Sequence, residues 1–207
     1  MAVFIYFLKG NKMNEIVLRG YLRDIGFSHF QGNIEYEKAN LICPRTGGKD
    51  EDVISLRYKK YTNKYKEGDF IELTGNIRSY SSQNKDKNNV QIYVFTYFDK
   101  PEEISNNSLI IDGRICKIED LRYSKSGVPY VHFILANNIF TPDGKKINSY
   151  IPCICYSSDA YKIISLGVSA KIKIIGEFHS HTYKKILDDE IEFRVAHEVT
   201  VKEIRLN

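Results

Sequence analysis

Apolar and polar residues alternate with a period of two along most of the chain, which is the pattern of half-buried β-strands. Turn-forming residues separate the alternating runs, and two short helical patterns interrupt them near 59–66 and 159–166. The pattern predicts an all-β fold with two short helices. The predicted strands are 16–22, 53–58, 70–77, 90–95, 109–115, 130–135, 150–156, 170–176 and 191–195.

The order of these elements repeats. Residues 14–22 match residues 107–115 at an offset of 93, and residues 68–77 match 167–176 with one or two residues of slip. Five strands with a helix before the fourth is the plan of the oligonucleotide-binding (OB) fold, a partly open Greek-key barrel. We therefore predict two tandem OB-fold barrels, each five-stranded and each with a short helix before its fourth strand.

The domain boundaries follow from this repeat. We expect an N-terminal extension or extra strand at 1–12, a first OB-fold module at 13–98, a linker at 99–106 and a second OB-fold module at 107–207. The linker is polar and contains Pro101, as is typical of a domain boundary.

Composition adds one unusual feature to an otherwise ordinary globular protein. The chain contains 15 Tyr and 11 Phe but no Trp. A tyrosine offers a flat ring and a hydroxyl, so it suits wet surfaces as well as cores, although strands also select aromatic residues for packing alone. The net charge of +4 gives modest support to a polyanionic partner.

Signals of other classes are missing from the sequence. The apolar start at 1–8 is too short to span a bilayer, and it lacks the features of a secretory signal. Structural or free thiols indicate a reducing compartment, so we expect a cytoplasmic protein. The four cysteines form no disulfide framework and no metal-ligand spacing, and His179 with His181 is weak evidence for a metal. There is no phosphate-binding loop, nucleophile elbow or zinc-protease motif. We expect no catalytic residues, no cofactor and no metal.

The stretch from 107 to 183 carries a family resemblance. A strand ends in Gly113-Arg114, a polar turn at 121–127 contains Arg-Tyr and Ser-Gly, an alternating strand follows at 131–136, and a later strand at 172–176 ends in Gly. In this order the segments resemble the bacterial single-stranded DNA-binding protein (SSB) family, and the first module is similar to it more loosely.

The resemblance implies that aromatic residues stack on bases and that basic residues follow the phosphates. In the second module it implies a set of nucleic-acid-binding residues: Phe140, Tyr150, Tyr156, Tyr183, Arg114, Arg122, Lys145, Lys146, Lys184 and Lys185. In the first module the corresponding set is Tyr36, Tyr58, Tyr80, Arg19, Arg57 and Arg78.

The run 57–66 can be interpreted in two ways. It mixes five cations with three tyrosines, which suits a single nucleic-acid strand. Tyr58, Tyr61 and Tyr65 also have a helical spacing, so they could instead form the inward face of an amphipathic helix.

The resemblance also has limits. SSB proteins end in a flexible tail with an acidic, apolar tip that recruits other enzymes, whereas this chain ends at 199–207 directly after the last predicted strand. We therefore expect a tandem variant without that tail. Two modules per chain imply that a homodimer would supply four OB folds, the number in an SSB homotetramer.

We expect binding and protection of single-stranded DNA in replication, recombination or DNA transfer. RNA would use the same surface. The alternative is an OB-fold module for protein–protein interaction, like a primosome adaptor, because a fold alone does not determine function.

Overall fold

The computed structural model describes residues 13–206 apart from 46, 48, 49, 63, 85, 86, 102–106, 141–143, 188 and 189. In that part of the chain the fold is built almost entirely from strands, so the predicted all-β class is confirmed. The first strand set consists of β1 (Asn14–Gln31), β2 (Ile34–Pro44), β3 (Glu51–Lys59), β4 (Phe70–Asn84) and β5 (Lys87–Thr96). The second consists of β6 (Ser108–Ile118), β7 (Arg122–Tyr123), β8 (Pro129–Phe140), β9 (Lys146–Tyr156), β10 (Lys171–Leu187) and β11 (Glu190–Leu206).

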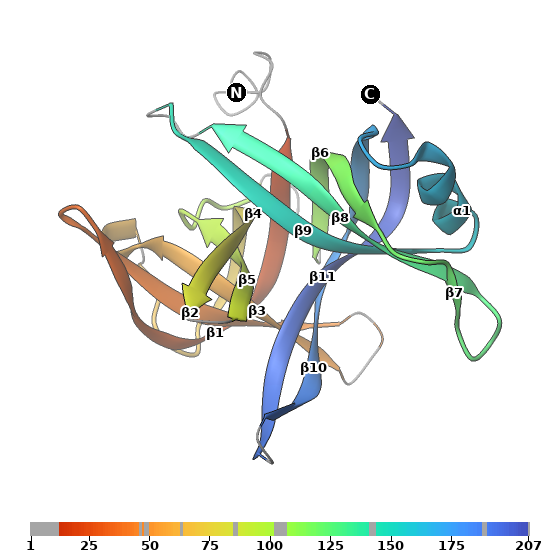
Figure 1. Ribbon diagram of the computed structural model, residues 1–207. Helices are drawn as coiled ribbons and strands as arrows, with labels where there is room; N and C mark the ends of the chain where they lie inside the picture. Colours follow the sequence, from red (N-terminus) through yellow and green to blue (C-terminus); the bar gives the residue numbers. More distant parts are fainter. Residues whose placement is uncertain are drawn as a thin grey trace.

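Strand pairing closes each set into a circuit. In the first set, neighbours run β1–β2–β3–β5–β4 and back to β1; in the second they run β6–β8–β9–β11–β10 and back to β6. The β3–β5 and β9–β11 pairs are parallel, and the other pairs in these circuits are antiparallel. Closure leaves few exposed strand edges and places alternate side chains inside each circuit. Figure 1 shows the two circuits side by side.

The helices differ between the two sets. In the second set α1 (Ser157–Leu166) lies between β9 and β10 and buries Ala160 and Ile163. In the first set the described residues near 59–66 form only a three-residue 3-10 helix, η2 (Lys60–Thr62). The reason is that Tyr58 continues the inward face of β3 and packs on Phe98 with ring centroids 4.7 Å apart. Tyr58, the first tyrosine of the predicted helical face, therefore belongs to strand β3 and not to a helix.

The two sets join through their first strands. Strand β1 pairs with β6 in antiparallel register, with Ile16 opposite Leu109. These two residues occupy equivalent places: Ile16 pairs with Gly75 in the first set, and Leu109 pairs with Gly176 in the second. A residue that pairs with its own counterpart marks a local twofold axis, so the two sets are arranged like the halves of an isologous dimer.

Two asparagines support this arrangement in equivalent ways. The Asn14 side chain donates to the Ile77 carbonyl and accepts from the Ile77 N–H, at 2.8 and 2.9 Å. The Asn107 side chain makes the same two bonds with Phe178, at 2.7 and 2.8 Å. Each asparagine thus satisfies a buried backbone N–H and C=O of its own set, on β4 and on β10 respectively.

Two seams flank the local axis, and their backbone bonds also correspond. At one seam the Tyr150 N–H donates to Ser79 Oγ at 2.8 Å, and the Ser79 N–H donates to Ser149 Oγ at 3.4 Å. We call this the β4–β9 seam. At the other, the β3–β10 seam, the Val53 N–H donates to Ser180 Oγ at 2.8 Å. There the Ser180 N–H donates to Asp52 Oδ1 at 2.7 Å.

Candidate nucleic-acid interface

The outer face of β3, β4 and β5 combines a cation with aromatic rings. The Arg57 guanidinium carbon lies 4.3 Å from the centre of the Tyr93 ring and 5.6 Å from that of Tyr80, and Arg57 donates to Gln91 Oε1 at 2.8 Å. The pairing of Tyr80 with Gln91 aligns β4 and β5 so that these side chains share one face. Tyr80 is 51% exposed, so part of its ring is open to a ligand.

Arg78 lies on the same face but is more deeply buried. Its guanidinium carbon sits 3.8 Å from the centre of the Phe95 ring. Burial lowers the pKa of Arg78, and neighbouring tyrosines, Tyr93 first among them, oppose this effect. A cation held on a ring away from water contributes positive potential to the surface, but Arg78 is poorly placed to contact a phosphate directly.

Burial changes the roles of two predicted tyrosines. Tyr58 is fully buried, so it cannot stack on a base and belongs to the core rather than to the candidate interface. Tyr36 is also buried, and the His29 ring already lies parallel to it at a centroid distance of 4.7 Å. Tyr36 therefore packs next to Phe95 at the edge of the aromatic face, and its ring is not free to stack on a base.

Arg19 lies apart from this face. Its guanidinium carbon is 5.5 Å from the centre of the Phe70 ring, at the start of β4. Ten residues along β4 separate Phe70 from Tyr80, which corresponds to about 30 Å at roughly 3.3 Å per residue. Arg19 and Arg57 are thus two cations on rings at opposite ends of one strand.

Three of the predicted aromatic residues of the second set are well exposed. Tyr150 is 53% exposed and stands beside the β4–β9 seam, where its N–H is bound by Ser79. Tyr156 ends β9, with its ring 6.0 Å from that of Tyr130. Tyr183 is on β10, 41% exposed, with its ring 6.4 Å from the His181 ring. The side chain of Phe140 lies outside the described residues.

The predicted basic residues of the second set are scattered. Lys145 and Lys146 are exposed at the start of β9, and Lys184 lies 5.7 Å from the centre of the Phe193 ring on the β10–β11 hairpin, next to Lys185. Arg114 donates to the Ser169 carbonyl, and Arg122 pairs with Glu119 at 3.6 Å. Their binding roles stay predictions.

Two contributors to the first-set face, Tyr93 and Phe95, were not among the sequence candidates. The run 90–95 was predicted as a strand, and its alternation places Gln91, Tyr93 and Phe95 on one face. That spacing was the available signal. Their position beside Arg57 and Arg78 depends on strand pairing that the sequence does not display.

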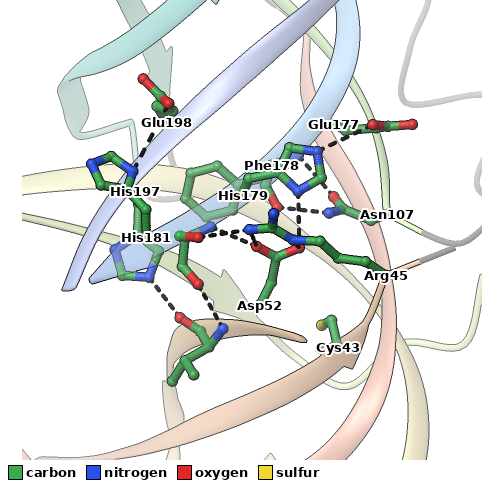
Figure 2. Close-up of polar contacts among 12 residues, drawn as sticks. Cys43, Arg45, Asp52, Asn107, Glu177, Phe178, His179, His181, His197 and Glu198 are labelled. Carbon is green, nitrogen blue, oxygen red and sulfur yellow. Dashed lines mark hydrogen bonds and ion pairs between the residues drawn. The ribbon is translucent and has the colours of Figure 1, made fainter. Parts of the chain in front are cut away.

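A charged cluster occupies the β3–β10 seam (Figure 2). Asp52 is 1% exposed and accepts hydrogen bonds from Arg45 at 2.7 and 3.1 Å and from the Ser180 N–H. His179 Nδ1 lies 2.9 Å from Asp52 Oδ2, and its Nε2 lies 3.1 Å from Glu177 Oε2. Because ionised carboxylates only accept, an imidazole that binds one through each nitrogen is protonated.

The ionisation of this cluster follows from its contacts. Burial alone would raise the pKa of Asp52, but hydrogen bonds from His179, Arg45 and the Ser180 N–H lower it to about 2. The bond to Asp52 raises the pKa of His179, against the opposing effect of burial. Burial lowers the pKa of neighbouring His197, whose Nε2 lies 2.8 Å from the Val53 carbonyl. His179 therefore serves as an ion-pair partner, and within the described residues no group of three or more His, Cys, Asp or Glu is arranged to hold a metal.

Comparisons by sequence find no relative of this protein. No protein-family model matches the sequence, and no curated protein sequence matches it either. Within the described residues no helix has the length and apolar character needed to cross a membrane.

Solved structures do match. Wild-type single-stranded DNA-binding protein from Thermus aquaticus aligns with a TM-score of 0.69 at 15% identity, covering 96% of this chain and 94% of that one. A deletion mutant of the same protein gives 0.70 at 16% identity, covering 95% of each chain. The PriB protein from Ralstonia solanacearum aligns over 50% of this chain and 100% of its own, with 13% identity and a TM-score of 0.39. The resemblance indicated by the sequence is thus confirmed for the fold: nearly the whole chain folds like a bacterial single-stranded DNA-binding protein.

Proposed function

We propose that this protein binds and protects single-stranded DNA through two tandem OB-fold barrels, with boundaries at 13–98 and 107–207 and a linker at 99–106. The observation that carries the proposal is the face on which Arg57 lies between Tyr80 and Tyr93. A single strand offers what such a face binds, because its phosphates are anionic and every base has a π surface.

The mechanism combines stacking and counterion release. Exposed rings such as Tyr80, Tyr150 and Tyr183 take bases, each contributing about 1–3 kcal/mol without strong sequence preference. Arg57 and the exposed lysines neutralise phosphates, so affinity falls as salt rises. No bond is made or broken in this mechanism. It would serve replication, recombination or DNA transfer in the cytoplasm.

We further propose that two chains associate, giving four OB folds. The motivation is that one chain already contains two strand sets related by the local twofold at Ile16 and Leu109. Light scattering at micromolar concentration should give about twice the mass of one 24.0 kDa chain. A mass of one chain would contradict the dimer without affecting the binding proposal.

Binding itself is tested by fluorescence anisotropy with a labelled dT strand of about 30 nucleotides, long enough for several OB folds at about 4–16 nucleotides each. We expect tight binding at low salt that weakens as salt rises. The variant Arg57→Gln should weaken binding and lower the salt slope by about one.

Arg19→Gln is the comparison variant, because Arg19 is also a predicted binding cation on a ring but lies at the other end of β4. An RNA strand of the same length tests whether the surface prefers DNA. No binding at low salt would overturn the proposal and favour a protein-docking role for the barrels. Equal losses for the two arginine variants would show that the face around Arg57 is no more important for binding than the region around Arg19.

A further inference from the structure

A groove of about 540 Å³ separates the two strand sets on the side of the β3–β10 seam. One wall is the outer face of β2, β3 and β5, and the other is formed by the β10–β11 hairpin, together with Pro152 of β9. In Figure 1 this hairpin extends from the second set past the ribbons of the first. The volume lies within the range of about 300–1,000 Å³ that is usual for ligand sites.

The two walls carry complementary chemistry for a nucleotide strand. The first-set wall supplies the cations Lys38 and Arg57 and the ring of Tyr93. The opposite wall supplies the ring of Tyr183 and a small apolar surface at Val195 and Ala196. The exposed ring on the hairpin wall suits a base, and the cations on the first-set wall suit phosphates.

Polar side chains complete the first-set wall. Gln91, Asn40 and Ser55 line it with groups that can pair with base edges. One carboxylate, Asp24, also lines the groove, and it accepts a hydrogen bond from Asn40 Nδ2 at 2.9 Å. The two cations exceed the single carboxylate among these named residues, which favours an anionic occupant.

The walls are held at a set separation because the seam beneath them is hydrogen-bonded. The Val53 N–H donates to Ser180 Oγ at 2.8 Å, and the Val53 carbonyl lies 2.8 Å from His197 Nε2 at the base of the hairpin wall. Asp52 and His179 add an ion pair at 2.9 Å. A preformed groove binds an ordered strand with less conformational cost than a mobile one.

We infer that one nucleic-acid strand passes through this groove from the first strand set to the second, with Tyr183 stacking on a base and the Tyr93 ring holding Arg57 from behind. This inference rests on the proposed function and deepens it, because it makes the two sets one composite site rather than two separate ones. The phosphates next to that base lie against Lys38 and Arg57.

A charge placed inside the groove tests this path. Ala196 lines the groove, and Ala196→Glu adds a negative charge there. Ser126→Glu makes the same change in net charge at an exposed turn of the second set. Using the dT strand and the full chain, we expect Ala196→Glu to weaken binding at least tenfold, and Ser126→Glu to leave it within about twofold.

A second pair of variants tests the stacking. Tyr183→Ala should weaken binding roughly 5- to 150-fold, the effect of losing one stacked base. Tyr123→Ala removes another exposed tyrosine, on β7, which does not line the groove, and should have little effect. Tyr183 is exposed, so its removal leaves the core intact, and thermal unfolding confirms folding of each variant.

The outcomes separate the two proposals. Wild-type binding that weakens with Ala196→Glu and Tyr183→Ala but not with their controls supports the path. Wild-type binding that neither variant changes overturns the path alone and leaves the proposed function standing. No wild-type binding overturns both. Capture of an acidic peptide in the groove in preference to the dT strand also overturns the path.

Discussion

The β4–β9 seam and the β3–β10 seam occupy equivalent places, yet they differ in chemistry. In both, a serine, Ser79 of β4 or Ser180 of β10, accepts a hydrogen bond from a backbone N–H of the other set. The partner of the serine N–H is Ser149 at one seam and the buried Asp52 at the other. The hydrogen bonds of the backbone N–H groups thus follow the local twofold axis. The seams differ because Ser149 makes one of them neutral and Asp52 makes the other ionic.

The residue that follows Ser149 or Asp52 in the sequence differs between the seams as well. At the neutral seam it is the exposed Tyr150, and at the ionic seam it is the half-buried Val53. This difference indicates a division of roles. The ionic seam joins the sets through a buried ion pair, while the neutral seam joins them through hydroxyls and leaves an aromatic ring exposed.

The largest effect is expected from Asp52→Ser, which gives the ionic seam the residue of the neutral one. The change leaves His179 and Arg45 without their buried carboxylate, and breaking a buried pair in this way costs about 3–5 kcal/mol. Because Arg45 is 35% exposed, we expect the lower end, about 3 kcal/mol, in the free energy of unfolding from urea titration. Ser149→Ala, the equivalent change at the neutral seam, should cost about 1 kcal/mol. Similar losses at both seams would contradict the distinction.

The next effect concerns affinity. Tyr150→Ala should weaken binding of the dT strand more than Tyr80→Ala. The Arg57 guanidinium already lies over the Tyr80 ring, whereas no cation or ring of the described residues is in contact with Tyr150. Each loss is expected within about 1–3 kcal/mol. Fluorescence anisotropy measures both, with Tyr21→Ala as a control at a distant exposed tyrosine. A greater loss for Tyr80→Ala would reverse the ranking and place the main contact on the first set.

The smallest effect is a change with pH. The contact with Asp52 raises the pKa of His179 above its ordinary 6.5, so its stabilising contribution is fully present below pH 6.5 and is lost as pH rises through the raised pKa. Wild type should therefore exceed His179→Gln in stability most at low pH, and the difference should shrink as pH rises. His197 has the opposite sign, because its pKa is lowered, but both proteins contain it and its effect cancels.

Urea titrations of both proteins between about pH 5.5 and 9 measure this difference, in the range where stability is usually greatest and just above it. The range lies above the pKa of Asp52, so that carboxylate stays ionised throughout. A difference that is constant or grows with pH would show that His179 is not protonated in the seam.

The sequence predicted the strands more reliably than the site. Because alternation is a local signal, eight of the nine predicted runs lie within observed strands, and the run 170–176 begins one residue before β10. Strand β2 was missed, although Ala39, Leu41 and Cys43 alternate as buried residues. Burial of Tyr58 was also available from the pattern, since it follows Ile54 and Leu56 at a spacing of two.

The seams and the groove could not be predicted in the same way. Asp52 and Ser180 are 128 residues apart, and no local pattern pairs them. The Arg57 contacts with Tyr80 and Tyr93 likewise need the β3–β5–β4 order, which brings distant segments together. The sequence offered Arg57 and Tyr80 as candidates by their residue types alone, and their contact follows from the strand pairing.

The pairing of Ile16 with Leu109 has a consequence for dilution. In an association of identical chains, such a contact dissolves as concentration falls, and every residue on one side recurs on the other. Here the chain itself ties the two partners together, so their effective concentration is set by the connection between β5 and β6. Dilution therefore cannot separate the two strand sets. Because the sets are encoded separately, they can differ in sequence, so one seam contains a carboxylate and the other a hydroxyl.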